Sequence, residues 1–375
     1  MPSFNIIEVT DNSELNAFIK IPFQLYINEK YYVPHLISER KTFFSNDKNP
    51  FFKHARAKYF LAVKNGKPVG RIAGIVNDLH NEFHGEKTGF FGFLDCIDDM
   101  DVAGALLKSA EDYVRSEGME LIRGPMNFST NDEVGLLIEG FDSLPAFMMT
   151  YNPPYYIRLY EKSGLKKAED LIAFYLDENS PPSERWLKIV EKMRARSRIN
   201  IRNIKLNEFE SELEIIRTIY NSAWSKNWGF VPMTEEEFQH TADDFRKLVD
   251  PNLVFIAFVD DDPAGFILGM PDYNCVFKKM NGRLFPAGIL KFLYYTKINK
   301  IIHGLRVITM GVVHKYQKFG LDAIFFVDIY NAGRHRGYNW AELSWILDRN
   351  TMMVKAAENM GARPYKKYRI YEKPL

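Results

Sequence analysis

Apolar and polar positions along the first half of the chain change their period several times, as strands and helices do. Period-two alternation and short apolar runs predict strands, and apolar residues three or four positions apart predict amphipathic helices. The dipeptide Asn65-Gly66 marks a tight hairpin turn between two such strands. The predicted order is a strand at 5–9, a helix at 12–27, a hairpin over 58–76, a strand at 89–97, a helix at 102–118 and a strand at 119–128.

The second half of the chain repeats this order of elements. A polar stretch with two prolines, residues 177–184, separates the halves. The topology is therefore duplicated, although the halves share no obvious sequence identity. We expect an N-terminal domain at 1–178, a linker helix at 179–198 and a C-terminal domain at 199–375. The elements predicted for the second half are a strand at 200–206, a helix at 208–228, a hairpin over 252–270, a strand at 306–313, a helix at 321–337, a strand at 340–347 and a helix at 350–361.

Composition narrows the classes of protein to which the chain can belong. Its 375 residues are 46% hydrophobic and 14% aromatic, which is enough apolar material for two cores. The formal net charge of +1 gives no general attraction to nucleic acid, so no DNA partner is expected and any positive site must be local. Cys96 and Cys275 are expected to be small core residues in a reducing compartment. The chain shows no signal-peptide pattern and no apolar run long enough to cross a bilayer, so we expect a cytoplasmic protein.

The segment 314–323, HKYQKFGLDA, lies between a predicted strand and a predicted helix. A glycine turn in this position exposes backbone N–H groups and the positive end of the helix dipole, an arrangement that binds phosphate. Gly320 allows close approach of a ligand, and Lys315 and Lys318 add positive charge. Asp322 is not the small residue that such a turn favours. We interpret it as a helix-start residue that points away from the ligand.

The element order together with this turn resembles the GNAT acyltransferase superfamily, whose signature is Gln/Arg-x-x-Gly-x-Gly/Ala. Gln317 and Gly320 match that signature. The resemblance implies an α/β (α+β) fold of two tandem GNAT-like domains, each a mixed, mostly antiparallel sheet flanked by helices. It also implies a coenzyme A site in the C-terminal half, where the turn binds the pyrophosphate and the preceding strand pairs with the pantetheine arm. The implied cofactor-binding residues are Met310, Gly311, Val312, Val313, Gln317, Lys318, Phe319, Gly320 and Leu321.

The equivalent turn of the first half, DCIDDMDVAG at 95–104, lacks both the signature and its basic residues. The carboxylates of Asp95, Asp98, Asp99 and Asp101 would repel a pyrophosphate. We therefore expect a helix whose start is capped by acidic side chains. The N-terminal domain is expected to have a GNAT-like fold without a coenzyme A site.

The group that protonates the departing thiolate is not evident in the second half. In the GNAT superfamily this group is a tyrosine of the last helix, within the motif YEKxG. Tyr160 has this position in the first half, whereas alignment on Gly361 places Ala357 there in the second. The thiolate would then be protonated by another tyrosine, by water, or by no group of the enzyme.

The predicted strand at 340–347 offers other catalytic groups. Strand alternation places Glu342 and Ser344 on one face, where the carboxylate could take a proton from an acceptor amine. Asn350 is placed to cap the last helix, with positioning of the thioester as the alternative. The last strand carries Tyr365, Tyr368 and Tyr371, and the sequence does not decide which of them faces the site. The candidate catalytic residues are Glu342, Ser344, Asn350 and Tyr368.

The loop at 122–156 is longer than a strand-to-helix connection requires, and it mixes polar with aromatic side chains. Long ordered loops in compact domains are usually functional. We expect either an acceptor pocket built by the first domain against the second, or a structural corner that packs the two domains. The candidate substrate-binding residues are Asn127, Ser129, Asn131, Tyr155 and Tyr156.

An apolar stripe, a basic run and a pair of histidines are each expected to have a structural role and not a functional one. The apolar stripe within 285–304 is expected to face the core, and contact with a membrane surface or a long-chain substrate is the alternative that we do not favour. The basic run at 192–202 is expected to be a solvated helix face, and contact with a cofactor phosphate or an anionic lipid is the less favoured alternative. The pair His80 and His84 lacks the order of zinc-protease ligands, so we expect a polar hairpin end and no metal site.

The function expected from these features is an N-acyltransferase that moves an acyl group from acyl-CoA to an amine by direct attack. The acceptor would be a small-molecule or lipid-like amine, by analogy with tandem members that N-acylate sphingoid bases, and the protein would be a monomer or homodimer. Two alternatives stay open. Because Ala357 replaces the usual tyrosine, the protein could be a non-catalytic acyl-CoA-binding or regulatory protein. Tandem GNAT folds also include aminoacyl-tRNA-dependent transferases.

Overall fold

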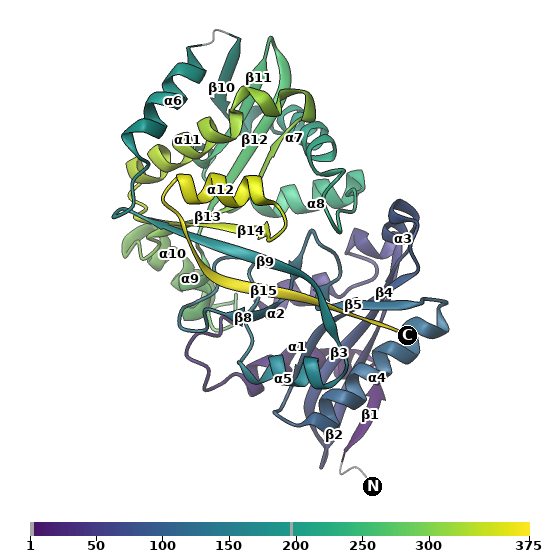
Figure 1. Cartoon of the computed structure of the whole chain (residues 1–375). Coiled ribbons are helices and arrows are strands. Elements are labelled where there is room, and N and C mark those ends of the chain that lie inside the picture. Colours follow the sequence, from purple (N-terminus) through teal and green to yellow (C-terminus); the bar gives the residue numbers. More distant parts are fainter. Residues whose placement is uncertain (1–3, 196–197) are drawn as a thin grey trace. The chain divides into compact units, whose positions relative to one another are not determined.

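A computed structural model describes residues 4–195 and 198–375 of the chain (Figure 1). Its tertiary contacts divide the chain into two compact units. Unit 1 comprises Met1–Leu171, Asn274–Asn299 and Lys366–Leu375, and unit 2 comprises Ile172–Tyr273 and Lys300–Tyr365.

Unit 1 is built on a sheet with the strand order β1-β2-β3-β4-β5-β15, in which only β4 and β5 run parallel. Asn65 and Gly66 form the predicted hairpin turn, both with positive φ. The strands are β1 (Asn5–Glu8), β2 (Ala55–Lys64), β3 (Lys67–Asn77), β4 (Thr88–Cys96), β5 (Leu121–Gly124), β6 (Met126–Asn127), β7 (Glu133–Val134) and β8 (Leu136–Glu139). The helices are α1 (Asn12–Leu25), α2 (Ile37–Phe43), α3 (Asp78–His84), α4 (Met100–Ser116), α5 (Tyr155–Lys162), α9 (Asn274–Met280) and α10 (Ala287–Leu293), with the short turns η1 (Pro50–Lys53) and η4 (Tyr294–Ile298).

Unit 2 has the strand order β9-β14-β13-β12-β11-β10. Among the neighbouring pairs from β14 to β10, only β13 and β14 run parallel. The strands are β10 (Ile199–Asn203), β11 (Val254–Val259), β12 (Asp262–Pro271), β13 (Gly304–Val312) and β14 (Trp340–Leu347). The helices are α6 (Glu184–Arg194), α7 (Phe209–Trp224), α8 (Glu235–Arg246), α11 (Leu321–His335) and α12 (Thr351–Asn359), with the short turns η2 (Leu206–Glu208), η3 (Pro251–Leu253) and η5 (His314–Phe319).

The last strand of each sequence half ends in the compact unit of the other half. β15 (Arg363–Pro374) enters unit 1, where Tyr371 is opposite Gly124 of β5. β9 (Lys166–Asp177) enters unit 2, where it is the neighbour of β14. The compact units are therefore not identical with the two halves of the sequence, although each half supplies most of one unit.

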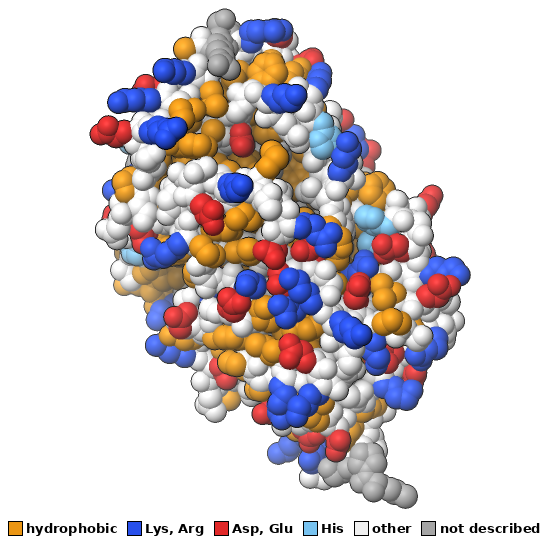
Figure 2. Space-filling view, in the orientation of Figure 1, with side chains coloured by type: hydrophobic (Ala, Val, Ile, Leu, Met, Phe, Trp, Pro, Cys, Tyr) orange, Lys and Arg blue, Asp and Glu red, His pale blue; other side chains and the backbone are white. Residues whose placement is uncertain are grey.

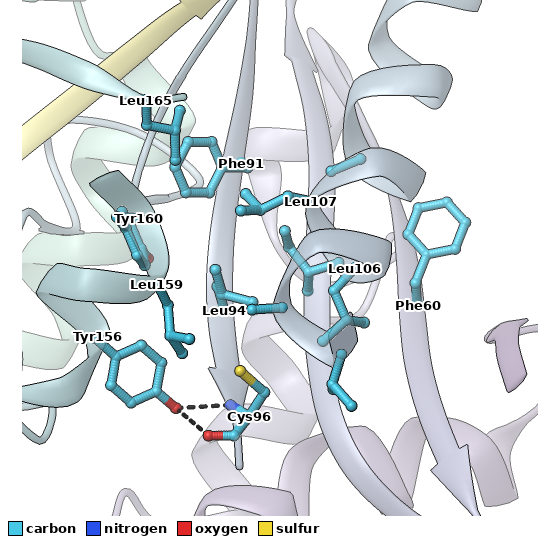
Figure 3. Close-up of a cluster of buried hydrophobic side chains, with 14 of the residues drawn as sticks. Phe60, Phe91, Leu94, Cys96, Leu106, Leu107, Tyr156, Leu159, Tyr160 and Leu165 are labelled. Carbon is cyan, nitrogen blue, oxygen red and sulfur yellow. Dashed lines mark hydrogen bonds between the residues drawn. The ribbon is translucent and has the colours of Figure 1, made fainter. Parts of the chain in front are cut away.

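Each unit has its own hydrophobic core beneath an amphipathic helix. In unit 1 the buried face of α4, which includes Leu106 and Leu107, packs on the sheet beside Phe91 and Leu94 of β4 (Figure 3). In unit 2 the buried side chains of α11 pack on those of β12 and β13. Both units are mixed α/β with mostly antiparallel sheets, which confirms the predicted fold class.

Two local predictions were wrong. His80 and His84 lie on the helix α3 and not at a hairpin end, because Asn77 caps the start of this helix and Gly85 ends it in the left-handed conformation. Within the described ranges 4–195 and 198–375, no group of three or more His, Cys, Asp or Glu side chains could hold a metal ion.

The second wrong prediction concerns the apolar stripe within residues 285–304, which belongs to an insertion of unit 1 at 274–299. Its members Leu290, Leu293, Tyr294 and Ile298 are exposed and do not face the core. The stripe is exposed because α9, the preceding helix, supplies the buried face of this insertion. In the part of the chain that the structure describes, no helix combines the length and the apolar character that a bilayer span needs.

Candidate functional site

The strands β13 and β14 run side by side over only part of their length. Their parallel register extends from Gly304 opposite Trp340 to Val307 opposite Leu343 and then stops. Both strands continue, β13 to Val312 and β14 to Leu347. Beyond Val307, β13 keeps its other neighbour, β12. The two strands therefore part in the middle of the sheet, and we call the free edge of β13 over residues 308–312 the β13 edge.

Some backbone N–H and C=O groups of the β13 edge point to the side on which β14 no longer pairs with it. The N–H of Val313 donates to the carbonyl of Ala264 at 2.9 Å, on the β12 side. Since backbone groups point to alternate sides along a strand, those of Met310 and Val312 point to the opposite side. Such an edge suits an extended ligand with amide groups, which can pair with it as a further strand does. Gly311 has no side chain because the ring of Trp224 on α7 lies where its Cβ would be.

The turn after β13 leads into the N-terminus of α11. Gly320 has φ +73° and is the N-cap residue of this helix, so no side chain caps the first turn. The first hydrogen bond to the cap runs from the N–H of Ile324 to the carbonyl of Gly320, at 3.2 Å. The amides before Ile324 have no partner within the helix, and with the helix dipole they form a place for an anion. Asp322 lies in this first turn, where an acidic residue is favourable.

Charged side chains surround this turn. Asp262, at the start of β12, accepts hydrogen bonds from Lys315 at 2.8 Å and from Tyr316 at 2.9 Å, and these bonds lower the pKa of its carboxyl group. The amide Nε2 of Gln317 lies 3.1 Å from Nδ1 of His314. Gln317 and Lys318 are exposed to solvent. Asp262 thus pairs with Lys315. In the described part of the chain no carboxylate pairs with the exposed Lys318 ammonium, so an anionic ligand at this turn could contact it directly.

A buried polar cluster lies where the two strands part. Arg306 of β13 is opposite Glu342 of β14, one register step before the last pair. Glu342 has no exposed surface. One of its oxygens, Oε1, accepts a hydrogen bond from Ser344 and lies 3.9 Å from Nε of Arg306, while Oε2 accepts from the hydroxyl of Tyr365. Arg306 Nε donates in turn to Ser344 Oγ at 2.8 Å.

This polar cluster can orient a proton-transferring hydroxyl. Arg306, Glu342 and Ser344 are all buried, whereas Tyr365 is only partly buried. Tyr365 is therefore the member of the cluster with the most accessible surface. The Glu342 carboxylate accepts the hydrogen bond of the Tyr365 hydroxyl and thereby holds it in place.

The other candidate catalytic residues lie elsewhere. Asn350 caps α12, its side-chain oxygen accepting from the N–H of Met353 at 3.2 Å. Tyr368 is fully buried in unit 1, opposite Leu137 of β8. Ala357 is fully buried in α12, so the helix position that carries Tyr160 in the first half has no polar group here.

In unit 1 the corresponding strands also part, but the chain itself fills the space. The parallel register of β4 and β5 ends at Phe90 opposite Arg123, while β4 continues to Cys96. The N–H of Phe93 donates to the side chain of Asn127 at 2.8 Å. A Cβ on Gly92 would lie only 2.2 Å from the carbonyl oxygen of Met126. The free edge of β4 is thus occupied by the segment that follows β5.

Two tyrosines of α5 close the end of this edge. The N–H of Cys96 donates to the hydroxyl of Tyr156 at 2.6 Å, and the Cys96 carbonyl accepts from that hydroxyl at 3.0 Å (Figure 3). The same carbonyl accepts from Tyr155 at 2.7 Å. The Tyr26 hydroxyl lies 2.9 Å from the Tyr156 hydroxyl. Burial raises the pKa of Tyr156 well above its usual value, so this hydroxyl remains a donor. In α12 the position of Tyr155, aligned on the glycine that ends each helix, is held by Met352, which is 76% exposed.

The acidic turn of unit 1 is likewise satisfied by neighbours. Asp99 caps α4 by accepting from the N–H groups of Asp101 and Val102, at 2.9 and 3.3 Å, as the sequence predicts. Asp95 accepts from Arg71 at 2.7 Å and from Tyr26. The start of α4 in unit 1 is thus capped by a carboxylate, whereas the corresponding start of α11 in unit 2, at Gly320, has no side-chain cap.

The remaining candidate substrate residues form local structure in unit 1. Asn127 bonds to Glu133 at 3.1 Å as well as to Phe93. Ser129 donates to Asp132 at 2.8 Å and accepts from the N–H of Asn131 at 3.1 Å, which makes a compact turn. These side chains and the two tyrosines of α5 therefore do not converge on one point.

Two residues of the polar cluster are absent from the sequence-based selection. Arg306 is the only charged residue in an otherwise apolar strand, and this isolated charge could have indicated a functional role. The sequence left Tyr365 undecided, because its pairing with Glu342 depends on how the last strand crosses unit 2.

No family model matches the chain. Two curated proteins are similar over almost the whole length. Protein YghO of Escherichia coli is 38% identical over 373 residues, which cover 97% of this chain and 94% of YghO. The bacterial ceramide synthase of Caulobacter vibrioides is 35% identical over 376 residues, which cover 99% of this chain and 97% of that protein.

Solved structures support the fold. A tandem GNAT protein from the clavulanic acid biosynthesis pathway matches with a TM-score of 0.57 at 10% identity, covering 99% of this chain and 98% of that one. A GCN5-related N-acetyltransferase from Sphaerobacter thermophilus matches with a TM-score of 0.54 at 13% identity, covering 100% and 96%. The chain has the tandem fold of GNAT acyltransferases and belongs to the family that includes YghO and the bacterial ceramide synthase.

Proposed function

We propose that this protein is an N-acyltransferase that takes an acyl group from acyl-CoA and joins it to the amine of a long-chain, lipid-like acceptor. The relative named as a ceramide synthase supports the acceptor class, because a ceramide is an amide of a long-chain amine. The tandem GNAT fold supports the transfer reaction.

The proposal rests on one difference between the units. The strand edge left free is occupied by the chain itself in unit 1, where β4 and β5 part, but not in unit 2, where β13 and β14 part. In unit 1, Asn127 and Tyr156 bind the backbone of β4, and Asp99 caps α4. In unit 2 the β13 edge is paired with β12 on one side only, and the first turn of α11 has no side-chain cap. We infer that unit 2 takes the acyl-CoA. Its pantetheine amides would pair with Met310 and Val312, and its pyrophosphate would bind at residues 317–321.

The polar cluster would then serve the acceptor. Attack of the amine on the thioester forms the C–N bond and breaks the C–S bond, so one proton must move from nitrogen to sulfur. Tyr365 would take the proton of the amine as its own proton passes to Glu342, and the same hydroxyl would return it to the thiolate. Arg306 and Ser344 keep the Glu342 carboxylate in place for both steps.

The experiment is a product assay with purified protein. Acetyl-CoA and palmitoyl-CoA are each offered with a short amine and with sphinganine, and amide products are measured by mass spectrometry. The proposal expects an amide of sphinganine with palmitoyl-CoA, and loss of that product in Tyr365→Phe. The absence of every amide product, together with tight acyl-CoA binding, would instead favour the non-catalytic acyl-CoA-binding protein to which the buried Ala357 points.

A further inference from the structure

The insertion of residues 274–299 in unit 1 is anchored by its first helix. In α9, Val276 and Met280 are buried. Asn274 donates from its side chain to the carbonyls of Pro145 and Ala146, at 2.9 Å each. Lys278 donates to the carbonyl of Tyr32 at 3.1 Å. The position of the insertion within unit 1 is therefore fixed by buried polar and apolar contacts.

The second part of the insertion turns apolar side chains outward. Of the nine large hydrophobic side chains that are exposed among the described residues, five belong to it. Four of them are spaced as neighbours on one side of a helix. Hydrophobic side chains reach the surface over α10 (Figure 2). We call these five residues the α10 surface: Phe285 (73% exposed), Leu290 (69%), Leu293 (48%), Tyr294 (48%) and Ile298 (74%).

The charged side chains of the insertion itself have a single sign. No Asp or Glu occurs between Asp272 and Asp322. Four cationic side chains of the insertion are exposed, namely Lys279, Arg283, Lys291 and Lys297. Within residues 4–195 and 198–375, none of these four forms an ion pair with a carboxylate, whereas many other exposed Lys and Arg residues do.

We propose that the α10 surface binds an anionic lipid bilayer. Large apolar side chains on a short, anchored helix can enter the boundary between headgroups and acyl chains, and neighbouring cations are attracted to anionic lipids. A second copy of the chain is a poorer occupant. A two-fold contact through this surface would bring its four cations against the same four of the partner.

This inference goes beyond the proposed function and does not depend on it, since bilayer binding is measured without any acyl transfer. If the acceptor is a lipid, the same surface would bring the enzyme to the membrane that contains it. An enzyme that acylates dispersed amines but does not bind vesicles would retain the proposed function and lose this inference.

The test is flotation of the full-length protein with two kinds of vesicle. One kind is phosphatidylcholine alone, and the other is equal parts phosphatidylcholine and phosphatidylglycerol. The proposal expects binding to the anionic vesicles that weakens as salt is added. Both Leu290→Ser/Ile298→Ser and Lys291→Glu/Lys297→Glu should reduce the bound fraction at least about tenfold.

The controls alter the same residue types elsewhere in unit 1. Phe83→Ser removes an exposed apolar side chain of α3, and Lys67→Glu reverses an exposed charge at the β2–β3 hairpin, so both should bind as the wild type does. Circular dichroism and light scattering are recorded for every variant. The proposal is overturned if the protein ignores anionic vesicles, if folded α10-surface variants bind as the wild type does, or if those variants convert a dimer to a monomer without changing vesicle binding.

Discussion

Arg306 and Glu342 are opposite each other on neighbouring parallel strands, one register step before those strands part. Their buried pair, with Ser344 and Tyr365, therefore lies at the inner end of the β13 edge. In the proposed reaction, this position would bring the cofactor next to the group that handles the proton of the acceptor.

Tyr365→Phe removes only the hydroxyl that Glu342 accepts. We expect kcat to fall about 100-fold, because general acid–base catalysis typically contributes about 100-fold or more, while KM for acyl-CoA changes little. Steady-state kinetics with palmitoyl-CoA measure both constants. Tyr368→Phe is the matched variant on the same strand, and a large loss there with none at Tyr365 would assign the role to the tyrosine selected from the sequence.

Glu342→Ala should destabilise unit 2, because it removes a buried carboxylate that lies 3.9 Å from the buried Arg306 guanidinium and accepts hydrogen bonds from Ser344 and Tyr365. Breaking a buried pair in this way costs about 3–5 kcal/mol of unfolding free energy. Glu342→Gln keeps the volume and should cost less. Urea unfolding measures the loss, with Glu178→Gln in an exposed pair as the control that should change stability by under about 1 kcal/mol. Equal stability of Glu342→Ala and wild type would contradict the described cluster.

Tyr156→Phe tests whether this side chain closes the edge of β4. The substitution leaves the buried N–H of Cys96 without its acceptor, which should cost about 1–3 kcal/mol. Tyr155→Phe loses a single bond to the Cys96 carbonyl and should cost less. Thermal unfolding compares the two variants, and an order in which Tyr155→Phe is the more damaging would be inconsistent with these hydrogen bonds.

Acid should weaken the fold through His80. Burial lowers the pKa of this imidazole from 6.5 to about 4, with His84 next to it acting in the same direction, although Glu86 opposes the shift. Because the pKa is lower in the folded state, the unfolded chain binds more protons below pH 6.5, and stability falls as the pH drops from there toward 4. The loss between pH 7 and pH 5 is about 2 kcal/mol. His80→Gln should remove most of this pH dependence in urea unfolding, while His84→Gln should retain it, and identical pH profiles in wild type and His80→Gln would refute the assignment.

Local chemistry made much of this fold predictable from the sequence. The hairpin at Asn65-Gly66, the glycine turn at Gly320 and the acidic cap at Asp99 each depend on a few adjacent residues, and each is found where the sequence predicts it. The GNAT fold followed from the order of such elements.

Features that depend on distant residues were not accessible from the sequence. The closure of β4 joins Tyr156 to Cys96 across sixty positions of the chain. The proximity of Tyr365 to Glu342 depends on the path of β15, a strand that is shared between the two units. The exposure of Leu290 could not be predicted either, because a helical stripe does not reveal whether another element covers it.

The central claim, a single acyl-CoA site in unit 2, is tested most directly by calorimetric titration of the full-length protein with coenzyme A. The account predicts one site per chain and binding about tenfold weaker in Lys318→Glu, where a reversed charge faces the pyrophosphate, but unchanged in Lys67→Glu. No binding, two sites per chain, or equal affinity in wild type and Lys318→Glu would contradict it.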